Sequence, residues 1–295
     1  MLVYKTEKLL RGKVIKRPSS TIKSPYVADI QLVDDDNDVI DFNTYLAHCP
    51  SLGCCGLSDK DSIVMLSENK NKTKTKYAVE LCCFCEIKKD KYIQEYISLK
   101  PKNAEHIAYE CLKNNLVLDI NNLEKKEKEK TFMNSRFDFY AVDKNNQEYI
   151  FEIKTVPLAY YVDVPKKEYK KHTEYIESCD INDKVSYFPD GYRKNANEPV
   201  SPRALKHIQE LEKISMETNI NCNLVYIVQR TDVKSMQTSN IDLIYKKAVQ
   251  KAWLNGVNIK VIQIQWNEYG EAHFYSNILP INLFEYSGPY RLEDL

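Results

Sequence analysis

The sequence lacks an excess of charge of either sign. Its 42 lysine and arginine residues are balanced by 42 aspartate and glutamate residues, so the formal net charge of the 295-residue chain is zero. A protein of this composition carries no overall attraction for a polyanion. Any surface that binds nucleic acid must therefore be a local concentration of lysine and arginine.

Long apolar runs and regular cysteine motifs are also missing. No apolar stretch approaches the length of a membrane span, and the first residues lack the basic-then-apolar layout of a signal peptide. The nine cysteines are odd in number and contain no two CxxC pairs, which disfavours both a disulfide framework and a zinc site. We therefore expect a cytoplasmic protein with free thiols and no membrane partner.

The first 90 residues contain several short β-prone segments. Hydrophobic residues make up 43% of the whole chain, which is enough for a substantial core. Polar stretches such as "DDDND" separate the segments, as loops separate the strands of a small barrel. The segments are "GKVIKR", "YVADIQLV", "VIDF", "SIVMLS" and "KYAVELCCFC". We expect a β domain over residues 1–90.

The pattern changes to helices and strands over residues 95–295. A helix is expected near residues 103–114, whereas "LEKKEKEK" (123–130) has no apolar period and is interpreted as a solvated loop or helix end. Residues 157–200 are expected to be an irregular insert. Ser201 and Pro202 have the residue types of a helix N-cap and first helical position.

The last hundred residues alternate between strand and helix. "NLVYIVQ" (223–229) has the continuous apolar character of a strand covered on both faces. An amphipathic helix follows and stops at Gly256, and "VNIKVIQIQW" is a further strand. Strand, helix and strand in succession predict a right-handed crossover and an α/β sheet.

A hairpin over "SRFDFYAVDKNNQEYIFEIKT" (135–155) carries the most informative polar residues. Opposed residues of an antiparallel pair have a constant index sum, so an odd loop centred on Asn145 pairs Asp138 with Glu152. An even loop would send the two carboxylates to opposite faces. Asn145 and its neighbour tolerate the left-handed backbone of such loops, and we predict the odd register.

Two carboxylates that share a cleft repel each other unless one is protonated or a cation lies between them. Mg²⁺ prefers oxygen ligands, lowers the pKa of bound water and neutralises charge on a phosphate. Lys154, two residues after Glu152, can orient that water. The competing interpretation is a solvated strand face, because Glu-x-Lys occurs four times, beginning at Glu86, Glu124, Glu152 and Glu168. The occurrence at Glu152 differs by its apolar flanks and its acidic partner.

The chain resembles the sugar fermentation stimulation protein (SfsA) family. The resemblance covers nearly the whole chain and is carried by "AHCPSLGCCGL", "KYAVEL", "SRFDF", "FEIKTV", "FPDG", "PRALKHIQEL" and "VYIVQRTDV", in the order of the family. It implies an OB-fold-like β-barrel domain (1–90) joined to a PD-(D/E)XK nuclease-like mixed-sheet domain (95–295). The overall class is therefore α/β, or α+β. Some positions depart from the family pattern, among them Thr155, Cys54 and Ala204, which puts the ligand contacts of the N-terminal domain in doubt.

The resemblance also implies roles for individual residues. Asp138, Glu152 and the Ile153 carbonyl would hold Mg²⁺ or Mn²⁺, and Lys154 would position water. The family's glutamate on the preceding helix matches Glu110, with Glu105 as a poorer match. Residues expected to contact the substrate are Asp190, Arg203, Lys206, His207 and Arg136, and at the end of a buried-looking strand Gln229 and Arg230.

Two groups of cations have alternative interpretations. Lys70, Lys72, Lys74 and Lys76 recur at period two, so a strand would carry all four on one face, either to contact phosphates or as a solubilising hairpin tip. Arg203, Lys206 and His207 fall in the first turns of a helix, where they either bind phosphate together with the helix N-terminus or form a polar helix face. Arg230 could equally form a structural ion pair.

The sequence therefore predicts a DNA-binding protein with Mg²⁺-dependent phosphodiester hydrolysis. The alternative is a non-catalytic DNA-binding transcriptional regulator that retains a nuclease-like fold. Processing of RNA or nucleotides stays open, because nothing in the sequence recognises the 2′-hydroxyl. A homodimer, the strand preference of the DNA and the mode of cleavage are also left open.

Overall fold

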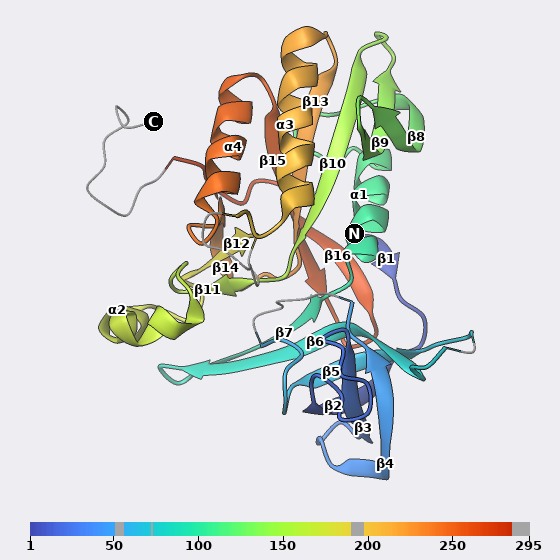
Figure 1. Cartoon of the computed structure of the whole chain (residues 1–295), viewed down its shortest axis with the longest axis vertical. Helices are drawn as coiled ribbons and strands as arrows, with labels where there is room; N and C mark the ends of the chain where they lie inside the picture. Colours follow the sequence, from blue (N-terminus) through green and yellow to red (C-terminus); the bar gives the residue numbers. More distant parts are fainter. Residues whose placement is uncertain (51–55, 72, 190–197, 285–295) are drawn as a thin grey trace.

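The computed structural model describes residues 1–50, 56–71, 73–189 and 198–284. Its N-terminal strands form one end of the molecule and its helices pack on a sheet at the other (Figure 1). At the N-terminal end, β2 (Leu10–Lys16), β3 (Val27–Val33), β4 (Val39–His48), β5 (Ile63–Glu68) and β6 (Tyr77–Lys88) pair in the order β4-β3-β2-β5-β6. A parallel pairing of β4 with β6 at Ala47 and Tyr77 closes these five strands into a ring.

The ring of strands has an apolar interior. Inward-facing side chains from different strands, among them Val14, Ile30, Val64 and Val79, are fully buried. Each β-prone segment expected in the first 90 residues overlaps one of these strands. Alternation of apolar and polar residues was a sufficient signal here, because one face of each strand lies against the core and the other against water.

One sheet continues from the ring into the helical region. β7 (Lys91–Ser98) forms a long hairpin with β6 and meets β15 (Asn258–Trp266) where Tyr96 opposes Trp266. The sheet then runs in the order β15-β13-β10-β9-β8. β1 (Leu2–Lys5) pairs with β16 (Glu271–Ser276), which in turn pairs with β15, so the chain begins beside its last long strands.

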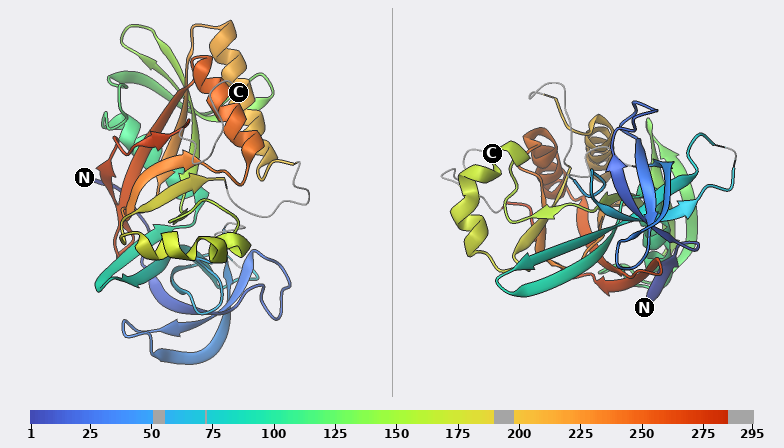
Figure 2. Two further views of the ribbon diagram at one scale, coloured as in Figure 1. Left: turned by 90° about the vertical axis from the view of Figure 1, so that its left-hand side faces the viewer. Right: turned by 90° about the horizontal axis from the view of Figure 1, so that it is seen from below.

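The central strands of the second region form a mixed sheet. β10 (Glu148–Val156), β13 (Asn221–Val228) and β15 are parallel, while β9 (Ser135–Asp143) and β8 (Leu123–Phe132) are antiparallel to their neighbours. Figure 2 shows α1 (Pro101–Lys113) on one face of this sheet and α3 (Pro202–Glu217) with α4 (Leu243–Leu254) on the other. The mixed α/β class and the parallel strand–helix–strand arrangement are confirmed.

Local signals placed the two long C-terminal helices correctly. The Ser201 hydroxyl accepts a hydrogen bond from the Ala204 backbone N–H at the start of α3, and Pro202 takes the first helical position. Asp242 caps α4 by accepting from the Tyr245 N–H. The chain leaves α4 at Gly256, whose φ of 93° favours glycine.

The charged segment 123–130 is strand β8, and the expectation of a loop or helix end is wrong. Among the described residues β8 pairs with β9 alone and lies at the edge of the sheet, a position where charged residues, lysine above all, are common because they discourage further strand pairing. The Lys128 ammonium lies 4.5 Å from the centre of the Tyr109 ring, and that of Lys130 lies 3.7 Å from the centre of the Tyr140 ring. The lysines therefore cover aromatic faces that the apolar pattern of the segment itself does not reveal.

The insert 157–200 is more regular than expected. It contains β11 (Ala159–Tyr160), the 3₁₀ helix η1 (Lys166–His172), α2 (Thr173–Ser178) and β12 (Lys184–Phe188). β11 and β12 join β14 (Val233–Thr238) and β17 (Ile281–Asn282) in a second, four-stranded sheet. Short strands that pair with distant segments carry too little local pattern to be recognised in advance.

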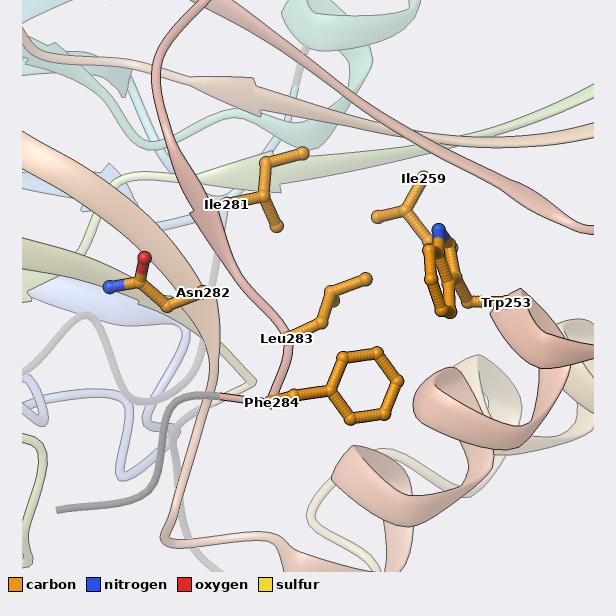
Figure 3. A pocket seen from close by; sticks show the side chains of 6 residues that line it. All are labelled: Trp253, Ile259, Ile281, Asn282, Leu283 and Phe284. Carbon is orange, nitrogen blue, oxygen red and sulfur yellow. The ribbon is translucent and has the colours of Figure 1, made fainter. Parts of the chain in front are cut away.

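A shallow hollow lies beside the end of α4. Figure 3 shows its lining, none of which is charged: Trp253, Ile259, Ile281, Asn282, Leu283 and Phe284. Nothing in this lining supplies the acid, base or metal ligand that chemistry on a phosphodiester needs. Among the described residues, no helix is both long and apolar enough to cross a membrane.

Candidate active site

The β9–β10 hairpin has the predicted odd register. Phe139 lies opposite Phe151 and Tyr140 opposite Ile150, which is the index sum expected for the odd loop. Asp143 stabilises the loop, because one of its carboxylate oxygens accepts from the backbone N–H groups of Asn145 and Gln147. The turn chemistry of the loop thus fixes which carboxylates meet.

The regular pairing of the two strands stops just before the acidic residues. The last regular backbone pair of the two strands is Phe139 with Phe151. One residue further along β9, the Asp138 carboxylate accepts a hydrogen bond from the Ile153 N–H at 2.6 Å. Phe137 turns towards α3, while Phe139 packs on Tyr109 of α1. A side chain thus occupies the place of a ladder carbonyl, and Asp138 is held directly beside the Glu-Ile-Lys segment.

Glu152 is almost fully buried, with 2% of its surface exposed. Its Oε1 accepts hydrogen bonds from the Lys154 ammonium and from Nδ1 of His207 on α3. Its Oε2 is also buried and has no hydrogen-bond partner among the described residues. A buried carboxylate oxygen without a donor is costly, so this atom is a candidate ligand for a cation.

The two carboxyl groups have opposite pKa shifts. Burial, and then the charge of Glu152, raise the pKa of Asp138 to about 7. Burial also acts to raise the pKa of Glu152, but Lys154 and His207 outweigh it and hold that pKa below its ordinary value. Near neutral pH Glu152 is ionised and Asp138 only in part, so the pair carries between one and two negative charges, and a divalent cation would favour ionisation of both groups.

The helix glutamate nearest the pair is Glu105. Its charge adds to the raised pKa of Asp138, and burial, together with the charges of Glu129 and Glu152, raises the pKa of Glu105 itself. Glu110 instead pairs with Lys113, 3.4 Å away. Five residues along a helix correspond to a rotation of about 140°, so the two glutamates cannot face the same point.

A sequence signal for Glu105 existed. It follows Ala104 and precedes Ala108 by three residues, so it borders the apolar stripe that packs on the sheet. Glu110 lies further around the helix. The family resemblance pointed to Glu110, although Glu105 has the better position on the helix.

Arg203, Lys206 and His207 lie in different surroundings although they share one helix end. Arg203 is exposed, and its charge opposes the raised pKa of Glu105, which locates it near the acidic pair. The Lys206 ammonium donates to the Asn134 carbonyl at 2.6 Å. His207 is 5% exposed and its side chain is bound to Glu152, so it does not present its ring to solvent.

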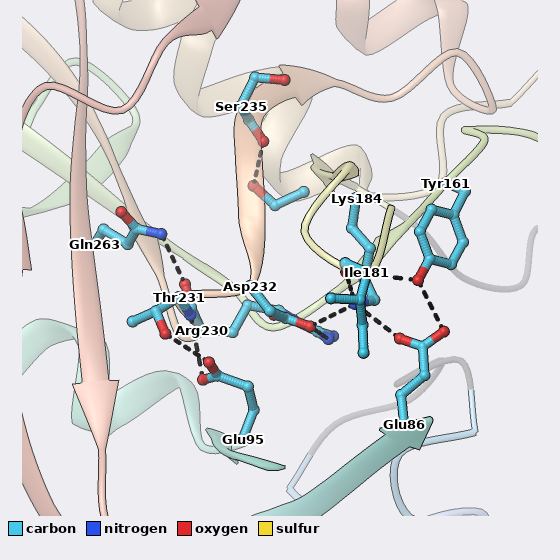
Figure 4. Close-up of polar contacts among 11 residues, drawn as sticks. Glu86, Glu95, Tyr161, Ile181, Lys184, Arg230, Thr231, Asp232, Ser235 and Gln263 are labelled. Atoms are coloured by element: carbon cyan, nitrogen blue, oxygen red, sulfur yellow. Dashed lines mark hydrogen bonds and ion pairs between the residues drawn. The ribbon is translucent and has the colours of Figure 1, made fainter. Parts of the chain in front are cut away.

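Gln229 and Arg230 are buried in the structure. Arg230 makes two hydrogen bonds to the Asp232 carboxylate, at 2.5 and 2.6 Å, in a cluster with Glu95, Lys184 and Glu86 (Figure 4). Gln229 donates to the Thr155 hydroxyl and accepts from the Trp266 indole N–H. Arg230 thus has the placement of the structural ion pair, and neither side chain reaches solvent.

Lys70, Lys74 and Lys76 do not lie on a strand, so the expectation that they share a strand face is wrong. β5 ends at Glu68 and β6 starts at Tyr77, and these three lysines occupy the connection between the two strands. Lys70 pairs with Glu7 at 2.6 Å, Lys74 is exposed, and the Lys76 ammonium lies over the Tyr45 ring. Polar residues at period two do not make a strand when neither face has an apolar surface to cover.

Of three further predicted substrate contacts, the structure describes one. Arg136 is exposed on β9 and its guanidinium lies 3.4 Å from the Glu129 carboxylate. Lys72 and Asp190 lie outside the described residues. Their roles stay predictions.

The sequence of the chain is similar to those of known proteins. A family model described as "Sugar fermentation stimulation protein RE domain" matches residues 102–169 and 160–270. The sugar fermentation stimulation protein homolog of Pelagibacter ubique (strain HTCC1062) is 27% identical over 266 residues, which cover 89% of this chain and 92% of that protein. The homolog of Clostridium novyi (strain NT) is 28% identical over 258 residues, or 86% and 90% of the two chains.

A solved structure shares the fold. The structure of Pyrococcus furiosus SfsA in complex with Ca²⁺ aligns with a TM-score of 0.69 and 14% sequence identity. The alignment covers 96% of this chain and 99% of that chain. The common fold therefore extends over both the strand ring and the helical region.

Proposed function

The chain belongs to the sugar fermentation stimulation protein family, and from that premise we propose that it binds DNA and hydrolyses phosphodiester bonds with a divalent cation. One observation carries the proposal. Asp138 lies beside Glu152 where β9 and β10 separate, because its carboxylate accepts the Ile153 N–H and the charge of Glu152 raises its pKa, and the buried Oε2 of Glu152 has no donor among the described residues. Such a pair fits a hard cation better than it fits solvent.

The donor set suits Mg²⁺ or Mn²⁺. Asp138, Glu152 and the Ile153 carbonyl supply oxygen ligands, which these ions prefer. The Ca²⁺ bound by the Pyrococcus furiosus relative is likewise a hard cation, which supports this choice. When bound, such an ion supplies an activated water and neutralises charge on the phosphate.

The chain's own side chains would position the substrate. The Lys154 ammonium, held against Glu152 and only partly exposed, is within reach of a water or phosphate oxygen bound beside the pair. Arg203 at the start of α3 combines a cation with the N-terminal end of a helix, both of which favour phosphate. Glu105 adds a third carboxylate that can accept from water at the rim.

The test uses labelled single-stranded DNA, double-stranded DNA and RNA, each with Mn²⁺, Mg²⁺ or chelator. We expect metal-dependent cleavage of DNA by the wild type and its loss in Lys154→Ala, with DNA binding retained. Lys170→Ala is the matched control, because Lys170 ends another Glu-x-Lys tripeptide but lies exposed in η1. DNA binding without cleavage by the wild type would leave the regulator interpretation, and cleavage of RNA alone would change the substrate class.

A further inference from the structure

We propose that His207 is a positioning residue that fixes the Glu152 carboxylate for the divalent cation. This inference rests on the function proposed above and concerns how its metal site is built. The observation behind it is the contact of 2.5 Å between His207 Nδ1 and Glu152 Oε1. It joins α3 to β10, two elements separated by 45 residues of chain from Val156 to Ser201.

The direction of the hydrogen bond follows from the carboxylate. Oε1 of Glu152 also binds the Lys154 ammonium, which can only donate, so this carboxylate oxygen is an acceptor. His207 must therefore carry a proton on Nδ1 and donate it. A histidine held in this way resembles the outer residues that orient metal-binding carboxylates.

The imidazole ring is itself held in place. His207 is 5% exposed, and its ring centre lies 5.8 Å from that of Phe137 on β9. Phe137 is fully buried in the cluster beneath α3 and α4. Neither ring can turn away without losing packing, so the donor remains aimed at Glu152.

The two oxygens of the Glu152 carboxylate have different surroundings. His207 and Lys154 both donate to Oε1, whereas Oε2 is left buried and without a donor. The Lys154 ammonium has three donors and can share them between Glu152 and a bound phosphate or water, whereas Nδ1 of the buried His207 gives its single donor to Oε1. His207 is therefore the partner whose donor stays on Glu152 and leaves Oε2 available to the cation.

The experiment measures Mn²⁺ binding by calorimetry to metal-free protein at one fixed pH. His207→Phe keeps an aromatic ring against Phe137 but removes the donor, and we expect roughly 10- to 100-fold weaker binding. His207→Asn places an amide N–H near the position of Nδ1, and we expect it to retain most of the affinity. Gln209→Ala, an exposed change on the same helix, is the control and should bind as the wild type does.

The outcomes separate this inference from the proposed function. Unchanged Mn²⁺ affinity in a folded His207→Phe, or an equal loss in the Asn and Phe variants, would overturn the positioning role and leave the metal site intact. No Mn²⁺ binding by the wild type would overturn the proposed function, and this inference with it. If His207→Phe does not fold, His207→Leu replaces it in the same comparison with His207→Asn.

Discussion

Replacement of Asp138 by asparagine should make the metal-free protein more stable at neutral and higher pH. The Asp138 carboxyl is buried beside Glu152, and its pKa is raised from 3.8 to about 7. Asparagine has a similar shape and can still accept the Ile153 N–H through its carbonyl oxygen. It cannot ionise, so it removes the repulsion without removing the hydrogen bond.

The sign and size of the effect follow from proton linkage. Below pH 3.8 the folded and unfolded states both hold the Asp138 proton, and the carboxyl imposes no charge penalty. As pH rises to about 7 only the folded state retains it, so the wild type loses stability over this window and gains none back above it. At about 1.4 kcal/mol for each pKa unit, the largest loss is about 4 kcal/mol.

The assay is urea unfolding in chelator at pH 5 and pH 8, followed by the same measurement in Mg²⁺. We expect the advantage of Asp138→Asn to be larger by about 1–3 kcal/mol at pH 8 than at pH 5. Mg²⁺ should stabilise the wild type and not the variant. Asp90→Asn, which changes an exposed carboxyl in the β6–β7 turn, is the control. A variant that is less stable than the wild type at pH 8, or a difference independent of pH, would refute this reasoning.

Four other substitutions separate binding from stability. Arg203→Ala should weaken DNA binding several-fold and flatten its salt dependence, with the unfolding curve unchanged. Arg230→Ala should lower the free energy of unfolding in urea by about 3–5 kcal/mol, because it leaves the buried Asp232 carboxylate without its bidentate partner. A loss below about 1 kcal/mol, as expected for an exposed residue, would contradict this. Ser201→Ala should cost about 1 kcal/mol through the lost N-cap of α3. Ile107→Ala, in the fully buried core under α1, should cost about 2–5 kcal/mol in thermal or urea unfolding, and no loss would contradict the packing described here.

The sequence was most informative where local chemistry determines structure. The Asn-containing loop and the constant index sum were enough to predict the odd register of the hairpin, and the pairing of Phe139 with Phe151 confirms it. Ser201 and Gly256 were recognised as helix boundaries because capping depends on a few neighbouring residues. The mixed α/β class followed from the alternation of strand and helix patterns along the chain.

Features that depend on distant contacts were not predictable. The segment 123–130 is a strand because β9 pairs with it and because Tyr109 and Tyr140 lie beneath its lysines. His207 was expected at the substrate surface, yet it is buried against Glu152, a contact set by how α3 packs on β10. In each case the deciding partner lies outside the segment itself, in the following strand for 123–130 and 55 residues away for His207, so the pattern of the segment did not contain it.

The central claim is that the Asp138 and Glu152 carboxylates share one divalent cation. Anomalous diffraction from crystals grown with Mn²⁺ tests it directly, because the signal locates the ion without reference to activity. We expect one strong anomalous peak in contact with both carboxylates and beside the Ile153 carbonyl. A structure with no peak there, or with Mn²⁺ held only at surface acids such as Asp34 and Asp36, would contradict it.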